Sequence, residues 1–173
     1  TFDGNGTSGL NGINFLQGRT LLLEHVEFAS YGGNGVSFTP SSAATLSMHD
    51  VSISRAGQTS TTAGGILVAP TGTGSAALDL DDVHTADDRY GLSIAGPTTG
   101  VVRDTTIASP AEDGIVANAP TAAVDVTLDN VAINDAGTNG IAANGANAVL
   151  RISGCAVTGS AQGLLVSANG RIV

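Results

Sequence analysis

The segment Gly12-Ile13-Asn14-Phe15 decides the fold of this chain, because its order of glycine, apolar, variable and apolar residue returns six more times. The other copies are Gly35-Val36-Ser37-Phe38, Gly65-Ile66-Leu67-Val68, Gly91-Leu92-Ser93-Ile94, Gly114-Ile115-Val116-Ala117, Gly140-Ile141-Ala142-Ala143 and Gly163-Leu164-Leu165-Val166. Their glycines lie 23, 30, 26, 23, 26 and 23 residues apart, so the basic unit has 23 residues with insertions of three or seven. A fixed period of this length is typical of solenoids, in which each unit buries its apolar face only against its neighbours.

Each unit carries two further apolar patterns behind the glycine segment. In the first unit, Leu21 and Leu23, then Val26 and Phe28, are spaced two residues apart, which predicts two strands with one buried face each. The shift of phase between the two pairs predicts a corner.

The corner positions are His25, Asp50, Asp82, Asp104, Asn130 and Gly154. Asp, Asn and Gly tolerate left-handed backbone geometry, so we interpret this column as turn chemistry and not as stacked catalytic carboxylates.

Three short strands per unit predict an all-β chain, a single domain over residues 1–173 with about seven partial or complete coils. The pattern resembles the right-handed parallel β-helix of pectate-lyase-like proteins. More narrowly, it resembles bacterial right-handed β-helix repeat proteins of a branch without an assigned function. The resemblance covers nearly the whole chain and implies the fold, a secreted or cell-surface location and contact with carbohydrate, but no particular activity.

The ends of the chain fit the same pattern. Phe2 falls in the apolar column that ends the third strand, and Ile172 and Val173 begin another strand. We therefore expect exposed strand edges at both ends. Such edges favour end-to-end or edge self-association, or indicate a segment of a longer helix.

Composition narrows the classes of partner. The formal net charge is −9, which argues against nucleic acid and anionic membrane surfaces, because both require basic patches. We expect no membrane span, since no apolar stretch approaches the roughly 18 residues that a helix needs. The single cysteine, Cys155, is interpreted as an inert thiol in an apolar column.

The outward face of the glycine-led strands lacks catalytic side chains. Its positions are Asn14, Ser37, Leu67, Ser93, Val116, Ala142 and Leu165. The resemblance implies that a polysaccharide substrate would lie along this face. Glycoside hydrolysis requires two carboxylates at set separations, which these positions do not supply.

A second candidate region is the connection between the third strand and the next glycine. The stretch 54–64 is about five residues longer than its equivalents, and acidic residues follow in the next two units. The side chains that could act as acid or base are Asp87, Asp88, Glu112 and Asp113. The side chains that could bind a polar ligand are Arg55, Arg89, Tyr90 and Tyr31. The alternative interpretation is an exposed Arg89–Glu112 pair under a Ser/Thr-rich loop.

The outer positions of the second strand carry charge. They are Glu24, His49, Asp81, Arg103, Asp129 and Ser153. We interpret them as a charge ladder across adjacent strands. Asp79, Asp81 and Asp82 could form a Ca²⁺ site, although Arg103 argues against one, and we expect no metal cofactor.

Together these features predict a non-catalytic extracellular or cell-envelope module, structural or carbohydrate-interacting. The alternative is a polysaccharide lyase or glycoside hydrolase with its site on the loop side. Aromatic residues make up only 3% of the chain, which weighs against stacking on sugars.

Overall fold

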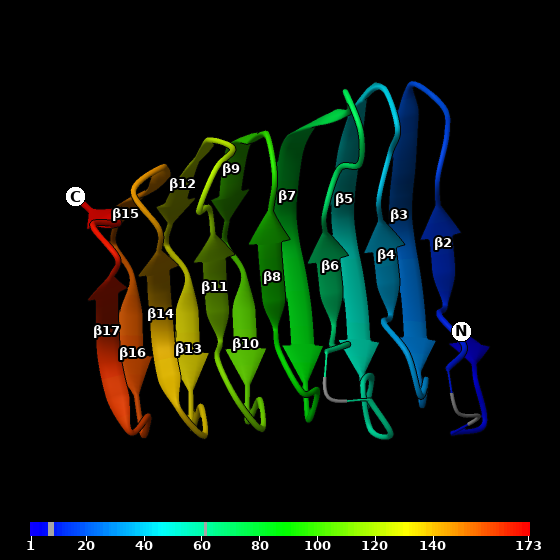
Figure 1. The fold of residues 1–173 in the computed structure, drawn as a ribbon. Coiled ribbons are helices and arrows are strands. Elements are labelled where there is room, and N and C mark those ends of the chain that lie inside the picture. Colours follow the sequence, from blue (N-terminus) through cyan, green and yellow to red (C-terminus); the bar gives the residue numbers. More distant parts are fainter. Residues whose placement is uncertain (7–8, 61) are drawn as a thin grey trace.

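The computed structural model describes residues 1–6, 9–60 and 62–173, and within them the chain forms strands and no helix (Figure 1). A 7-stranded parallel sheet contains β2 (Ile13–Phe15), β4 (Val36–Phe38), β6 (Ile66–Val68), β8 (Leu92–Ala95), β11 (Ile115–Asn118), β14 (Asn139–Asn144) and β17 (Gln162–Ser167). An 11-stranded sheet contains β1 (Phe2–Asp3), β3 (Thr20–Ala29), β5 (Ala43–Ser54), β7 (Ser75–Ala86), β9 (Thr98–Arg103), β10 (Thr106–Ala108), β12 (Val124–Asp129), β13 (Ala132–Asn134), β15 (Ala148–Ser153), β16 (Ala156–Thr158) and β18 (Arg171–Ile172).

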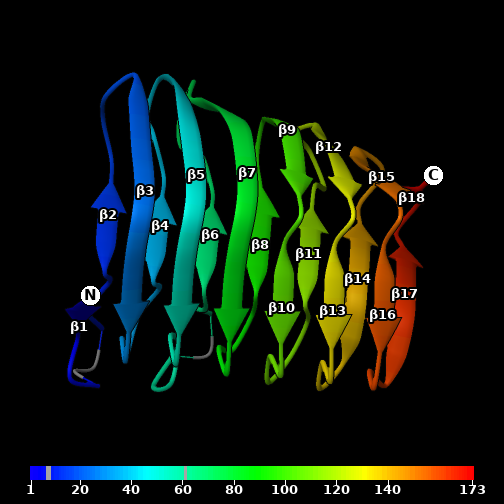
Figure 2. The same ribbon diagram turned by 180° about the vertical axis from the view of Figure 1, so that it is seen from behind.

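The two sheets are opposite walls of one solenoid of about seven turns. Figure 1 views it from the 7-stranded sheet and Figure 2 from the 11-stranded sheet, with the strands following one another from the N-terminus to the C-terminus. Each residue lies opposite its equivalent in the next coil: Ile115, for example, pairs with Leu92 on one side and Ile141 on the other. This register confirms the predicted coils and interior ladders.

The second and third strands are continuous in three of the coils. Strands β3, β5 and β7 run through the predicted corner, whereas the later coils divide there into separate strands, such as β9 and β10. The corner residues have positive φ throughout: His25 (55°), Asp50 (51°), Asp82 (54°), Asp104 (49°), Asn130 (53°) and Gly154 (61°). A single left-handed residue turns the chain without interrupting the hydrogen bonds to the next coil, so a strand can continue across it.

A second left-handed column, which the sequence analysis missed, ends the third strand of each coil. Its members are Ser30 (62°), Arg55 (55°), Asp87 (55°), Ser109 (50°), Asp135 (57°) and Gly159 (69°). Serine and arginine are not typical of this geometry, so the column is inconspicuous in the sequence. The residue after this corner points inward, and Ala56 and Ala136 are buried there.

The interior changes along the axis. The rings of Phe15 and Phe38 stack with centroids 4.7 Å apart, and the side chain of Phe38 is 0% exposed. Ala117 and Ala143 occupy the same column later. The wall keeps nearly the same length in the later coils, because β12, the corner and β13 together cover residues 124–134. Cys155 is half-buried, and its thiol donates to the carbonyl oxygen of Leu128 at 3.4 Å.

Both ends of the solenoid expose apolar side chains. Phe2 lies opposite Phe28, as the pattern predicts, and the two rings stack with centroids 5.7 Å apart. Phe2 nevertheless remains 59% exposed. At the other end Leu164 and Val166 of β17 are half exposed, because the described chain places no further coil on them.

The charge ladder on the 11-stranded sheet has the predicted register. His49 lies opposite Asp81, and Asp81 lies opposite Arg103. The guanidinium of Arg103 contacts Asp79 at 2.6 Å and Asp81 at 3.4 Å, both on β7. The negative charge of Asp79, and then that of Asp81, raises the pKa of Arg103.

We expect Phe38→Ala to lower the free energy of unfolding by about 3–5 kcal/mol, because it leaves a cavity in a fully buried aromatic column. Phe2→Ala is the matched control and should cost less than about 1 kcal/mol, since that ring is largely exposed. Urea denaturation of both variants measures the difference. Equal losses would mean that Phe38 does not point into the interior.

We expect Arg103→Ala to cost about 1 kcal/mol or less, since the ion pairs of Arg103 are partly exposed to water. The loss should shrink as NaCl is added, because salt screens exposed charges. Denaturation at low and high salt measures both effects. A loss of several kcal/mol that salt leaves unchanged would contradict the surface ladder.

Candidate functional site

A shallow pocket of about 290 Å³ opens on the outer face of the 7-stranded sheet. Ser93 of β8 and Val116 of β11 form its floor, at the outward positions that the sequence pattern predicts. The floor is sunk between its neighbours: Val116 is 8% exposed and the adjacent Ala142 is 0% exposed. Polar residues line the rims, namely Tyr90 and Asp113 before the strands, Asn118 and Asn144 at their ends, and Thr62.

The long connection supplies the Thr62 side of the pocket and is held to both adjacent coils. The amide of Gly57 donates to the carbonyl oxygen of Gly33 at 2.7 Å. The side chain of Gln58 donates to the carbonyl oxygen of Asp87 at 2.7 Å. The connection therefore packs as part of the solenoid wall at these two points.

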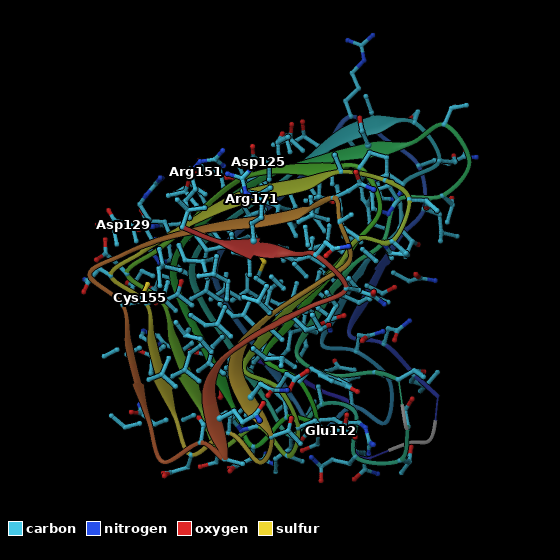
Figure 3. The ribbon with its side chains drawn as sticks, turned by 60° about the vertical axis from the view of Figure 1, so that its left-hand side comes forward. Glu112, Asp125, Asp129, Arg151, Cys155 and Arg171 are labelled. Carbon is cyan, nitrogen blue, oxygen red and sulfur yellow. The ribbon has the colours of Figure 1, made fainter. Side chains whose placement is uncertain are left out.

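Glu112 joins the two side chains that precede β8. Its carboxylate forms an ion pair with Arg89 and accepts a hydrogen bond from the hydroxyl of Tyr90. The Arg89–Glu112 pair of the alternative interpretation is therefore found, although it is half-buried, and Tyr90 contacts the same carboxylate. Partial burial, followed by the hydrogen bond to Glu112, raises the pKa of Tyr90. In Figure 3, Glu112 lies at the lower edge of the coils, far from Asp125 and Arg151 on the upper side.

Asp113 belongs to a ladder of side chains that accept backbone hydrogen bonds from the next coil. Its Oδ1 accepts from the amide of Asn139 at 3.1 Å and from the side chains of Asn139 and Thr138. Earlier in the solenoid, Asn11 accepts from the amide of Asn34 at 2.7 Å, and Asn34 accepts from that of Gly64 at 2.9 Å. The sequence signal was an Asn or Asp directly before the glycine in four of the seven units, which the sequence analysis did not use.

The other two candidate carboxylates lie in opposite settings. Asp87 is exposed at the second left-handed corner. Asp88 points into the interior and is 1% exposed; its Oδ1 accepts from the amide of Ala56 at 2.6 Å. Burial raises the pKa of Asp88 to about 8. The four acidic candidates thus lie in four different environments and do not face one another across a common space.

Arg55 and Tyr31 lie away from the pocket. The guanidinium of Arg55 donates to the hydroxyl of Ser30 at 3.1 and 3.2 Å. Tyr31 was expected to bind a ligand, but its side chain is only 8% exposed and its ring packs edge-on against Phe28 at 6.4 Å. The reason is the left-handed residue before it, which turns Tyr31 inward and leaves no exposed ring face for a sugar.

Each histidine is paired with one aspartate. His25 contacts Asp50 at 2.7 Å, His49 contacts Asp81 at 3.5 Å, and His84 contacts Asp82 at 3.1 Å. The hydrogen bond that His25 donates to the carboxylate of Asp50 raises the pKa of His25. Within the described residues, no group of three or more His, Cys, Asp or Glu side chains is arranged to hold a metal ion. Two of the three aspartates of the considered Ca²⁺ site, Asp79 and Asp81, contact Arg103.

Comparison with known proteins agrees with this architecture. Over the part of the chain that the structure describes, no helix is long and apolar enough to cross a membrane. Neither a curated protein nor a solved structure matches the sequence significantly. The family described as "Right handed beta helix region" matches residues 1–173, the full length of the chain. With its parallel in-register coils, the chain belongs to the right-handed β-helix family.

Proposed function

We propose that this chain is a non-catalytic module that binds a glycan through the outer face of the 7-stranded sheet, on the cell surface or after secretion. The observation that carries the proposal is the pocket whose rims present the hydroxyl of Thr62 and the amides of Asn118 and Asn144 over a floor of small residues. Amides and hydroxyls both donate and accept hydrogen bonds, as sugar hydroxyls require. The carboxylate of Asp113, which also lines the rim, adds a hydrogen-bond acceptor.

The geometry of the sheet favours a polymeric ligand. Parallel strands lie about 4.8 Å apart, so a chain that runs along the solenoid axis meets equivalent positions on successive coils. Asn118 and Asn144 are such a pair, one coil apart. The net charge of −9 favours a neutral polysaccharide over pectin or alginate, since like charges repel.

The enzymatic alternative is a polysaccharide lyase or glycoside hydrolase that uses the loop-side carboxylates. It has less support, because Glu112 is engaged by Arg89 and Tyr90, and Asp113 accepts three hydrogen bonds from the next coil. Asp88 lies in the interior and Asp87 on an exposed corner. A general acid and base must both reach the bond that is cleaved.

A screen of neutral glycans, followed by calorimetry on any that bind, tests the proposal. We expect Asn144→Ala to weaken binding about fivefold to tenfold, as the loss of one hydrogen bond to the ligand predicts. Asn134→Ala is the matched control. Asn144 accepts from Ser167 of the next coil at 2.6 Å, and Asn134 accepts from Thr158 at 2.8 Å, but Asn134 lies outside the pocket.

Two results would contradict the proposal. One is that the chain binds none of the neutral glycans, or that Asn144→Ala and Asn134→Ala bind them equally well. The other is the release of new reducing or unsaturated ends that stops in Asp87→Asn or Glu112→Gln while the fold persists. That second result would establish the enzymatic alternative.

We also propose that chains associate end to end. The specific observation is that β2 and β17 are the two outer strands of the 7-stranded sheet, and both carry the repeated glycine and apolar pattern. Exposed strand edges of this kind pair with other chains. Leu164 and Val166 continue the interior ladders at one of these edges and are half exposed there, without a covering coil in the described chain.

Sedimentation of the 173-residue chain over a range of concentrations tests association. We expect species larger than a monomer, and Leu164→Lys should shift them toward the monomer because it places a charge on the apolar end face. Leu22→Lys is the control. Leu22 is also apolar and exposed, but it points outward from the side wall and does not lie on the end face. A monomer at every concentration, or an equal shift in both variants, would refute this proposal.

A further inference from the structure

The three histidines of the chain lie on successive coils of the 11-stranded sheet, on the wall opposite the pocket. His25 belongs to β3, His49 to β5 and His84 to β7. Their side chains are 73%, 52% and 50% exposed, so water and solutes reach all three. Histidine is the commonest metal ligand in proteins, and none of these three has a part in the pocket.

His25 and His49 are neighbours across the gap between two coils. Glu24, which precedes His25, is the register partner of His49. The two rings meet edge to face with their centroids 6.1 Å apart. Among the described residues, no comparable ring contact involves His84. Two of the three imidazoles thus form a pair.

An aspartate of the following coil orients each ring of this pair. Nδ1 of His25 donates to Oδ2 of Asp50 at 2.7 Å, and Nδ1 of His49 lies 3.5 Å from Oδ2 of Asp81. A neutral imidazole that directs its Nδ1–H to a carboxylate keeps its lone pair on Nε2. Histidines that ligate metals typically have this arrangement, because the carboxylate fixes the tautomer and raises the basicity of the ligating nitrogen.

We propose that Nε2 of His25 and Nε2 of His49 together bind a divalent transition-metal ion of the Ni²⁺, Cu²⁺ and Zn²⁺ group. Imidazole nitrogen suits these ions, whereas Ca²⁺ and Mg²⁺ prefer oxygen ligands. The described residues contain no group of three or more His, Cys, Asp or Glu arranged as ligands, so water completes the coordination and the site is open. This inference is independent of glycan binding, which uses the other sheet.

The geometry requires a rotation of the two rings and no movement of the backbone. A metal ion lies about 2.0–2.1 Å from each imidazole nitrogen, so both Nε2 atoms must turn toward one point. The exposure of the two side chains leaves room for that rotation. The pairing of β3 with β5 keeps their backbones on adjacent strands meanwhile.

The surrounding charges favour a dication. Glu24 lies opposite His49, while Asp50 and Asp81 contact the two rings. Arg103, the cation of this ladder, is engaged by Asp79 and Asp81 of β7. Carboxylates beside the rings therefore attract a metal ion even where they do not ligate it.

Calorimetric titration of the 173-residue chain with NiCl₂ at about pH 8, where free imidazole is neutral, tests the site after removal of any affinity tag. We expect His25→Asn and His49→Gln each to weaken Ni²⁺ binding at least about tenfold, because each removes one imidazole ligand. Asparagine suits the left-handed corner, since Asn130 occupies the equivalent position. His84→Gln is the matched control and should bind as the parent chain does, because Nε2 of His84 contacts Asp82 at 3.1 Å.

Two further titrations separate the role of the imidazoles from that of the carboxylates. Asp50→Asn should weaken Ni²⁺ binding about tenfold without changing the stoichiometry, as the loss of an orienting partner predicts. CaCl₂ at the same concentration should not displace Ni²⁺ from the parent chain, because oxygen ligands alone would be needed to hold Ca²⁺.

Four outcomes would overturn the proposal: no Ni²⁺ binding by the parent chain, unchanged binding in His49→Gln, an equal loss in His84→Gln, or displacement of Ni²⁺ by Ca²⁺. The last would mean that carboxylates hold the ion. If His25→Asn does not fold, His49→Gln decides the question. Its position faces outward, and serine occupies the equivalent position 153, so this variant leaves the interior unchanged.

Discussion

The pairing of each coil with its equivalent in the next coil is the constraint on which this structure depends. Backbone hydrogen bonds run between coils, so equivalent residues lie opposite each other along the axis. An interior position must therefore suit the same position one coil away on both sides. Apolar side chains meet that condition, and their burial supplies the main stabilisation of the coils. Both left-handed columns follow from the same constraint, since a bend that moved along the sequence would break the register.

Polar side chains also lie opposite their equivalents in the next coil. The role of an acidic residue therefore depends on its position within the coil. In the ladder before the 7-stranded sheet, Asp113 replaces asparagine as the acceptor of a backbone amide. On the outer wall, Arg103 bridges two aspartates in partly exposed surroundings. These carboxylates have structural partners, so their number alone does not indicate catalysis. Asp88 departs from the rule, because its column is otherwise occupied by small or apolar residues.

The longest insertion adds to the rim of the pocket on an otherwise regular scaffold. The longest spacing, 30 residues between Gly35 and Gly65, places a loop beside the outer face of the 7-stranded sheet. The loop adds Thr62 to a rim that Tyr90 and Asp113 already form.

The sequence by itself determined the solenoid, the interior ladders, the first corner column and the Arg89–Glu112 pair, because these depend on periodic residue chemistry and on register. It did not reveal that Tyr31 and Asp88 point inward, since the left-handed residue before each of them is serine or aspartate without a distinctive pattern. Only the tertiary structure decided that Asn118 and Asn144 share a pocket with Tyr90. These residues lie on opposite rims of the sheet, and the width and depth of the space between them depend on how each coil closes, which no single repeat encodes.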